Sequence, residues 1–171
     1  MRLDAACTVI LLGTAAFALG EPVRWGNASG GLRLGIRTTQ TDDRLPALEI
    51  VLENQGTQEW AVEFPDVDAG LVHSLHFEAV RNGEVLTVLD TATLKLHPPS
   101  LVRSAILLLA PGGRRTFVIP IDRFICVVDR QDTPLQAILS GGYSIRAGLS
   151  LRAVTLSTPF LATTEPDATS R

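Results

Sequence analysis

The chain has 171 residues, of which 46% are hydrophobic, 5% aromatic and 19% charged, and its 15 basic and 18 acidic side chains give a formal charge of −3. These values fit one folded domain and exclude a (β/α)₈ barrel, a two-domain dehydrogenase and a disordered chain. The acidic balance argues against a dedicated nucleic-acid binder, and two cysteines cannot form a disulfide scaffold.

Residues 1–20 have the pattern of a secretory signal peptide. Arg2 precedes an uncharged, mostly apolar run over residues 5–19, and small residues follow at Ala16, Ala18 and Gly20. The run is shorter than the roughly 20 apolar residues of a membrane-spanning helix. We predict cleavage near residue 20 and a secreted or periplasmic protein without a stable membrane span; an uncleaved anchor is the alternative.

From residue 32 onward the apolar residues recur with a period near two, which indicates β-strands. Leu48, Ile50 and Leu52 share one face of such a strand, and Glu49 and Glu53 share the other. Alternation of this kind favours an antiparallel sheet with one buried face. We therefore predict an all-β, antiparallel domain over residues 21–162, followed by a disordered polar tail over residues 163–171.

Two hairpins and one short helix are predicted within this domain. Asn82-Gly83 supplies both positive-φ positions of a type I′ turn between two alternating segments. A second hairpin is expected from residues 100–110 and 114–122 around Pro111-Gly112-Gly113, with an edge or an irregular strand end at Pro120. Residues 133–139 depart from period two and predict a short helix, with Thr133 as its cap and Pro134 at its first position.

After this helix, Tyr143, Ile145, Ala147 and Leu149 are predicted to face inward on a strand. A helical turn, a glycine and then Tyr143 resemble the tyrosine corner of Ig-like sandwiches, in which the phenol bonds to upstream backbone.

A second resemblance is carried by five motifs in order: Trp25-Gly26, residues 31–36, residues 53–56, residues 109–113 and residues 142–147. Together they look like exported bacterial Ig-like domains of unassigned role, which are loosely similar to BsuPI-type proteinase-inhibitor domains. The resemblance implies an antiparallel Ig-like β-sandwich with one short helix, and it raises proteinase inhibition as an alternative function.

The candidate metal ligands do not form a recognisable site. On a strand, His73 and His76 face opposite sides, and a site with Asp66 or Asp68 would require His73 to lie in the preceding loop. The DxDxG motif at residues 66–70 lacks the later oxygen ligands of a calcium loop, and His97 has no nearby partner. We expect no metal and no cofactor.

Catalytic motifs are likewise not found. The sequence has no GxSxG or SxxK nucleophile pattern, and Cys126, in an apolar run, is expected to be a buried structural residue. We interpret Gly112-Gly113-Arg114-Arg115 as a hairpin tip and not an anion site. No catalytic residue is assigned, and the chain is predicted not to be an enzyme.

The sequence therefore predicts a non-catalytic, exported Ig-like binding or structural module whose partner is an unidentified protein of the cell envelope or the extracellular space. The edge near Pro120 and the loop over residues 56–59 are the expected contact surfaces. In the alternative function, inhibition of a proteinase, residues 89–101 with Pro98-Pro99 would form the inhibitory loop.

Overall fold

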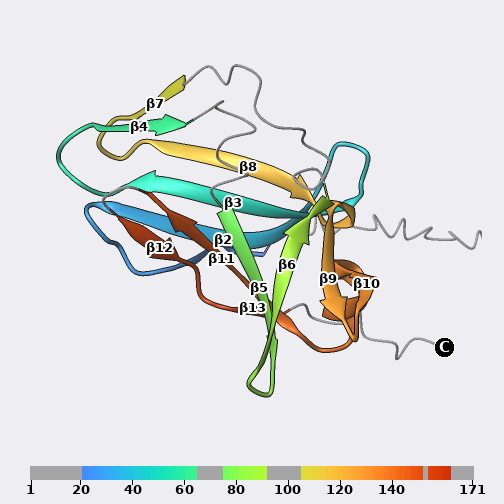
Figure 1. The fold of residues 1–171 in the computed structure, drawn as a ribbon. Coiled ribbons are helices and arrows are strands. Elements are labelled where there is room, and N and C mark those ends of the chain that lie inside the picture. Colours follow the sequence, from blue (N-terminus) through green and yellow to red (C-terminus); the bar gives the residue numbers. More distant parts are fainter. Residues whose placement is uncertain (1–20, 65–74, 92–104, 152–153, 163–171) are drawn as a thin grey trace, which may run out of the picture.

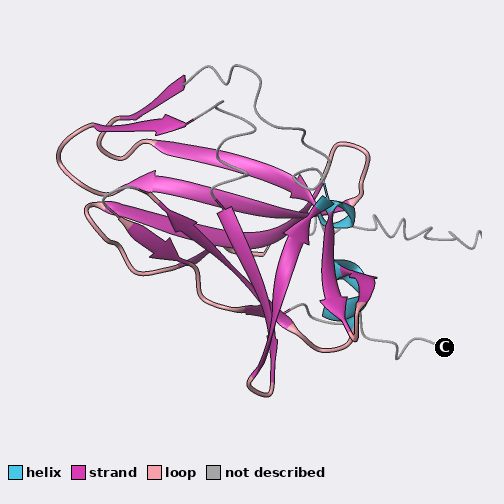
Figure 2. Cartoon of the chain, in the orientation of Figure 1, coloured by secondary structure: helices cyan, strands magenta, loops and turns pink. Residues whose placement is uncertain are grey.

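The computed structural model describes residues 21–64, 75–91, 105–151 and 154–162. In this part of the chain the strands form three sheets, and every strand pair is antiparallel (Figures 1 and 2). The prediction of an all-β, antiparallel fold is confirmed. The predicted signal peptide, residues 1–20, and the predicted tail, residues 163–171, lie outside the described residues.

Sheet A has the order β1-β2-β3-β8, and sheet B pairs β4 with β7. Sheet C has the order β10-β9-β6-β5-β11-β12, and β13 also pairs with β11. The strands of sheets A and B are β1 (Arg24–Trp25), β2 (Leu32–Gln40), β3 (Pro46–Asn54), β8 (Arg114–Pro120), β4 (Trp60–Phe64) and β7 (Ala105–Leu109). Those of sheet C are β5 (Leu75–Arg81), β6 (Glu84–Asp90), β9 (Phe124–Val128), β10 (Gln131–Pro134), β11 (Ser144–Ser150), β12 (Thr155–Ser157) and β13 (Leu161–Ala162).

Sheets A and C share one hydrophobic core. The predicted inward residues of β3 are fully buried, and those of β11 also belong to this core. On sheet C, the rings of Phe77 and Phe124 meet with their centroids 4.9 Å apart, a separation typical of favourable aromatic pairs. The period-two pattern therefore identified the side of β3 and of β11 that faces the core.

The first predicted hairpin is confirmed. Arg81 of β5 pairs with Glu84 of β6, and the intervening Asn82 and Gly83 have φ angles of 51° and 86°. Two positive-φ residues between directly paired strands define the twist of the primed turns that hairpins prefer.

The second predicted hairpin is wrong, although its turn exists. Gly113 N–H donates to the Ala110 carbonyl at 2.8 Å, but β7 pairs with β4 and β8 pairs with β3. Asn54, at the end of β3, exchanges backbone hydrogen bonds with Gly112 and Gly113. Because the turn is bound to β3, the chain leaves sheet B there and enters sheet A as β8.

Pro120 and the short helix lie close to where they were predicted. Pro120 is the last residue of β8, the edge strand of sheet A, and precedes the 3₁₀ helix η1 (Ile121–Arg123). The helix α3 spans Leu135–Ser140. Pro134 is its N-cap residue and not its first helical residue, because Gln131–Pro134 are paired with β9 as a strand. The predicted cap, Thr133, is therefore wrong, and no side chain caps the helix. No helix in the described ranges has the length and apolar character to cross a membrane.

Candidate functional site: outer faces and edges of the sheets

A ladder of charged side chains covers the outer face of sheet A. Arg33, Glu53 and Arg114 are register partners on β2, β3 and β8. The Glu53 carboxylate accepts hydrogen bonds from Arg33 Nε and, at 2.7 Å, from Arg114 Nε. The Arg33 guanidinium also lies 4.0 Å from the Trp25 ring centroid, within cation–π range.

This ladder corrects one expectation. Alternation predicted that Glu49 and Glu53 would face solvent, whereas both are buried, with Glu53 only 6% exposed. Arg37 pairs with Glu49 in the same way, at 2.7 Å. A carboxylate tolerates this burial because guanidinium groups supply the hydrogen bonds that water molecules would otherwise donate to it.

The pKa of Glu53 reflects this environment. Burial acts to raise the pKa of the carboxyl, but the hydrogen bonds and charges of Arg33 and Arg114 outweigh it, so the pKa lies below its ordinary value of 4.5. The ionised form is therefore favoured in the folded protein. Its contribution to the free energy of unfolding is fully present above pH 4.5 and is lost as the pH falls through the lower, folded-state pKa.

We expect Glu53→Gln to reduce the free energy of unfolding by about 1 kcal/mol near neutral pH, because solvent around the partly exposed Arg33 and Arg114 side chains screens part of the interaction. The difference from the unchanged protein should shrink as the pH is lowered below 4.5. Urea unfolding across the acid range measures it. Glu59→Gln, at an exposed carboxylate, is the control and should show a small difference at every pH. A loss for Glu53→Gln that stayed constant down to pH about 2 would contradict this explanation.

Tyr143 differs from the tyrosine-corner resemblance in its hydrogen bond. Its hydroxyl donates to Glu84 Oε2 at 2.6 Å, so the described acceptor is a side chain of β6 and not a backbone carbonyl. Arg81 lies 4.5 Å from the ring centroid and donates to the Gly141 carbonyl. The bond to Glu84, with burial, raises the pKa of the phenol. This cluster fastens the β5–β6 hairpin to the start of β11.

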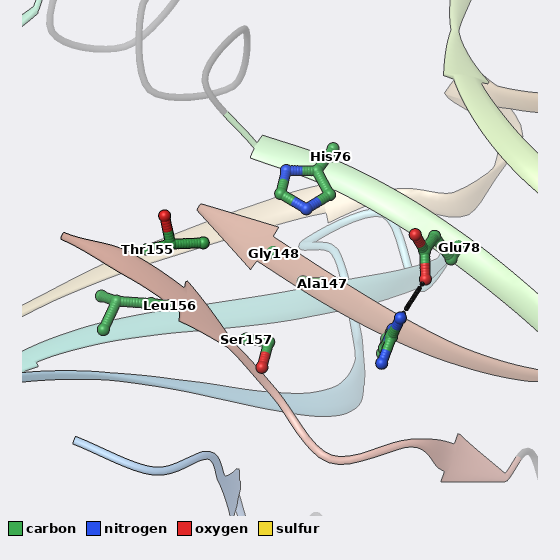
Figure 3. A pocket seen from close by; sticks show the side chains of 8 residues that line it. His76, Glu78, Ala147, Gly148, Thr155, Leu156 and Ser157 are labelled. Carbon is green, nitrogen blue, oxygen red and sulfur yellow. Dashed lines mark hydrogen bonds and ion pairs between the residues drawn. The ribbon is translucent and has the colours of Figure 1, made fainter. Parts of the chain in front are cut away.

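A shallow hollow lies on the outer face of sheet C (Figure 3). Gly148 of β11 forms its floor, with His76 of β5 on one side and Ser157 of β12 on the other. The His76 ring extends over β11, and Glu78 and Arg146 form an ion pair at 2.6 Å along one margin. The hollow thus gathers an imidazole, a carboxylate, a guanidinium and hydroxyl groups on three neighbouring strands.

These groups do not form a catalytic relay. Glu78 Oε2 accepts the bond from Arg146 Nε at 2.7 Å. Within the described residues, no hydrogen bond joins His76 to Ser157, Thr155 or Glu78. An activated nucleophile needs a base within hydrogen-bond reach and a third group that orients that base, and the described side chains of the hollow are not arranged in this way.

Of the histidines and aspartates weighed as metal ligands, the structure describes His76 alone. His76 is exposed on β5, whereas His73, His97, Asp66 and Asp68 lie outside the described residues. No group of three or more His, Cys, Asp or Glu side chains able to hold a metal ion occurs in the described ranges. Cys126 is fully buried in β9, as predicted, and burial raises the pKa of its thiol.

Sequence reasoning predicted a strand within residues 100–110 but missed that β7 lies at an edge and exposes apolar side chains. Ile106 is 65% exposed, and Leu108 is 57% exposed, the same fraction as Val85 on β6. Within the described residues, these three are the most exposed large hydrophobic side chains. Figure 1 shows β7 at the outer boundary of the molecule, beyond β4. Residues 105–110 are all apolar and do not alternate with polar ones; this was a usable signal, because such a strand leaves one apolar face exposed unless both faces are covered.

The predicted contact surfaces lie elsewhere. Thr57, Gln58 and Glu59 are exposed in the loop before β4, and Val118, beside Pro120 on β8, is 48% exposed. Most of the proposed inhibitory loop, residues 92–101, lies outside the described residues.

Comparison with protein-family models, with characterised proteins and with solved structures finds no match for this chain.

Proposed function

We propose that this chain is an exported, non-catalytic binding module of the Ig-like β-sandwich type. Two antiparallel sheets with one shared core support the fold, and the pattern of residues 1–20 supports export. The module takes up an extended segment of a partner protein in the cell envelope or outside the cell, and that segment adds as a strand to β7.

The exposed apolar face of β7 is the observation that carries this proposal. Ile106 and Leu108 lie two positions apart, so they project from the same face of the strand. Within the described residues β7 pairs with β4 alone, on one of its two edges. Its sequence, AILLL, contains none of the charges or prolines that protect edge strands from pairing.

Strand addition uses both of these properties. The backbone N–H and C=O groups along the second edge supply the ladder of hydrogen bonds, and alternate side chains of the added strand pack beside Ile106 and Leu108. Burying two large aliphatic side chains contributes about 3 kcal/mol or more before the cost of ordering the segment. The partner segment should therefore be extended and apolar at alternate positions.

The test is site-specific photo-cross-linking of the full chain in envelope and secreted protein fractions. A cross-linker at Leu108 should capture a defined partner, whereas one at Val85, equally exposed at 57% on β6, should not. A peptide from that partner should slow hydrogen exchange of the amides of residues 105–109 by about tenfold or more.

Charge on β7 provides the matched variants. The double substitution Ile106→Lys and Leu108→Lys should abolish capture, because lysine ammonium groups must be desolvated in the new interface, and Val85→Lys should leave it intact. Equal capture from both cross-linker positions, or unchanged exchange in β7 with the peptide bound, would overturn strand addition at this edge.

A further inference from the structure

The hollow over Gly148 has no role in strand addition at β7. We propose that it binds one ring of a neutral, hydroxyl-rich ligand, which is the chemistry of a sugar unit. A Cβ at Gly148 would lie 2.1 Å from His76 Nε2, so only glycine lets the imidazole lie over β11. The hollow beside it measures about 160 Å³, less than the roughly 300–1,000 Å³ of sites for drug-sized ligands. A single ring is therefore the occupant that it fits.

The hydrogen-bonding groups around the hollow are balanced between donors and acceptors. The hydroxyls of Thr155 and Ser157 can each donate and accept, and a neutral His76 imidazole offers one of each. Within the described residues these three side chains make no hydrogen bonds, in contrast with the paired side chains of sheet A. Sugar hydroxyls match such groups, because each one also donates and accepts.

The charges beside the hollow favour an uncharged ligand. Glu78 and Arg146 lie together at 2.6 Å and cancel each other. A bound anion would lie close to the Glu78 carboxylate and be repelled by it, and a bound cation would be repelled by Arg146 in the same way. The Arg146 guanidinium also lies 4.9 Å from the centroid of the Phe160 ring, which is 38% exposed and offers an apolar surface to the C–H groups of a sugar.

The experiment is an amide NMR titration of the ¹⁵N-labelled full chain with cellohexaose and, separately, with chitohexaose. At least one of them should shift the amide signals of Gly148 and Ser157, with a Kd on the order of 1 mM, as expected for a shallow site. Because the ligand is uncharged, this Kd should stay constant from about 0.05 to about 0.5 M NaCl. Inorganic phosphate should leave the same signals in place.

Two variants tie the binding to the hollow. Gly148→Ala places a methyl group where the imidazole lies and should weaken binding about tenfold or more, a change of about 1.4 kcal/mol. His76→Ala leaves the floor intact, tests the site even if Gly148→Ala fails to fold, and should weaken binding similarly. Thr116→Ala, at an exposed threonine of sheet A, is the control and should bind normally. No shift with either sugar, tighter and salt-sensitive binding of phosphate, or unchanged binding by His76→Ala would overturn the proposal.

Discussion

Replacing Asn54 with leucine is expected to lower the free energy of unfolding by about 3 kcal/mol. Asn54 is fully buried at the end of β3. Its side-chain amide donates to the carbonyls of Gln58 and Leu109, both at 2.8 Å, and its side-chain oxygen accepts from Gly56 N–H at 2.9 Å. Leucine has a similar size but removes the amide donor of the Gln58 and Leu109 carbonyls, whereas Gly56 N–H keeps its bond to the Gly31 carbonyl at 3.1 Å. An unsatisfied buried polar group costs about 1–3 kcal/mol.

The position of Asn54 makes this loss specific to one part of the fold. The Asn54 side chain connects two segments: the loop that follows β3 and leads to β4, and the end of β7, after which the chain returns to sheet A. We therefore expect Asn54→Leu to speed hydrogen exchange in β4 and β7 before it affects the centre of sheet C. Urea unfolding gives the total loss, and exchange mass spectrometry locates it.

Asn82→Gly is the matched control for this substitution. Asn82 is exposed in the β5–β6 turn with a φ of 51°, a conformation that glycine adopts readily. Its free energy of unfolding should stay within about 0.5 kcal/mol of the unchanged protein. If Asn54→Leu were equally mild, the amide would not be what holds sheet B to sheet A.

Gly26→Ala is expected to be at least as damaging, with a loss of about 3 kcal/mol or more. A Cβ at Gly26 would lie 1.7 Å from the carbonyl oxygen of Ser157. That oxygen belongs to the backbone of β12, so no side-chain rotation relieves the clash. Gly26 is also held from the other side, since its N–H donates to the Leu34 carbonyl at 2.8 Å. Sheets A and C would have to separate where the end of β1, in sheet A, meets β12, in sheet C.

A second glycine separates this steric effect from backbone strain. Gly112 has a φ of 74°, and apart from Gly112 and its two neighbours in the chain no atom lies within 4 Å of the position that an alanine methyl group would take there, so Gly112→Ala introduces strain without a clash. It should cost about 1–2 kcal/mol. Thermal and urea unfolding of both variants test the order. If Gly112→Ala lowered the free energy of unfolding as much as Gly26→Ala or more, close contact between the sheets would not be what requires glycine at position 26.

Local pattern determined much of this fold. The alternation of Leu48, Ile50 and Leu52 placed these residues in the core, because side chains two apart on a strand share a face whatever the strand pairs with. The turn at Asn82-Gly83 was equally local, since two residues able to adopt positive φ specify it. The helix at residues 135–140 was found through its departure from period two, although its exact first residue was not.

Contacts between residues far apart in the chain were decided only by the tertiary structure. Glu53 is bonded to Arg33, 20 positions away, and to Arg114, 61 positions away, so alternation could give its face but not its burial. The same limit explains why the second predicted hairpin is wrong. A turn and its two flanking strands do not reveal that β8 pairs with β3, or that β7 pairs with β4. The exposed face of β7 and the position of His76 over Gly148 also depend on which strands become neighbours. Strand pairing joins distant segments through backbone groups that all residues share, so the sequence determined the strands and their faces, and the tertiary structure decided their neighbours and the surfaces that remain exposed.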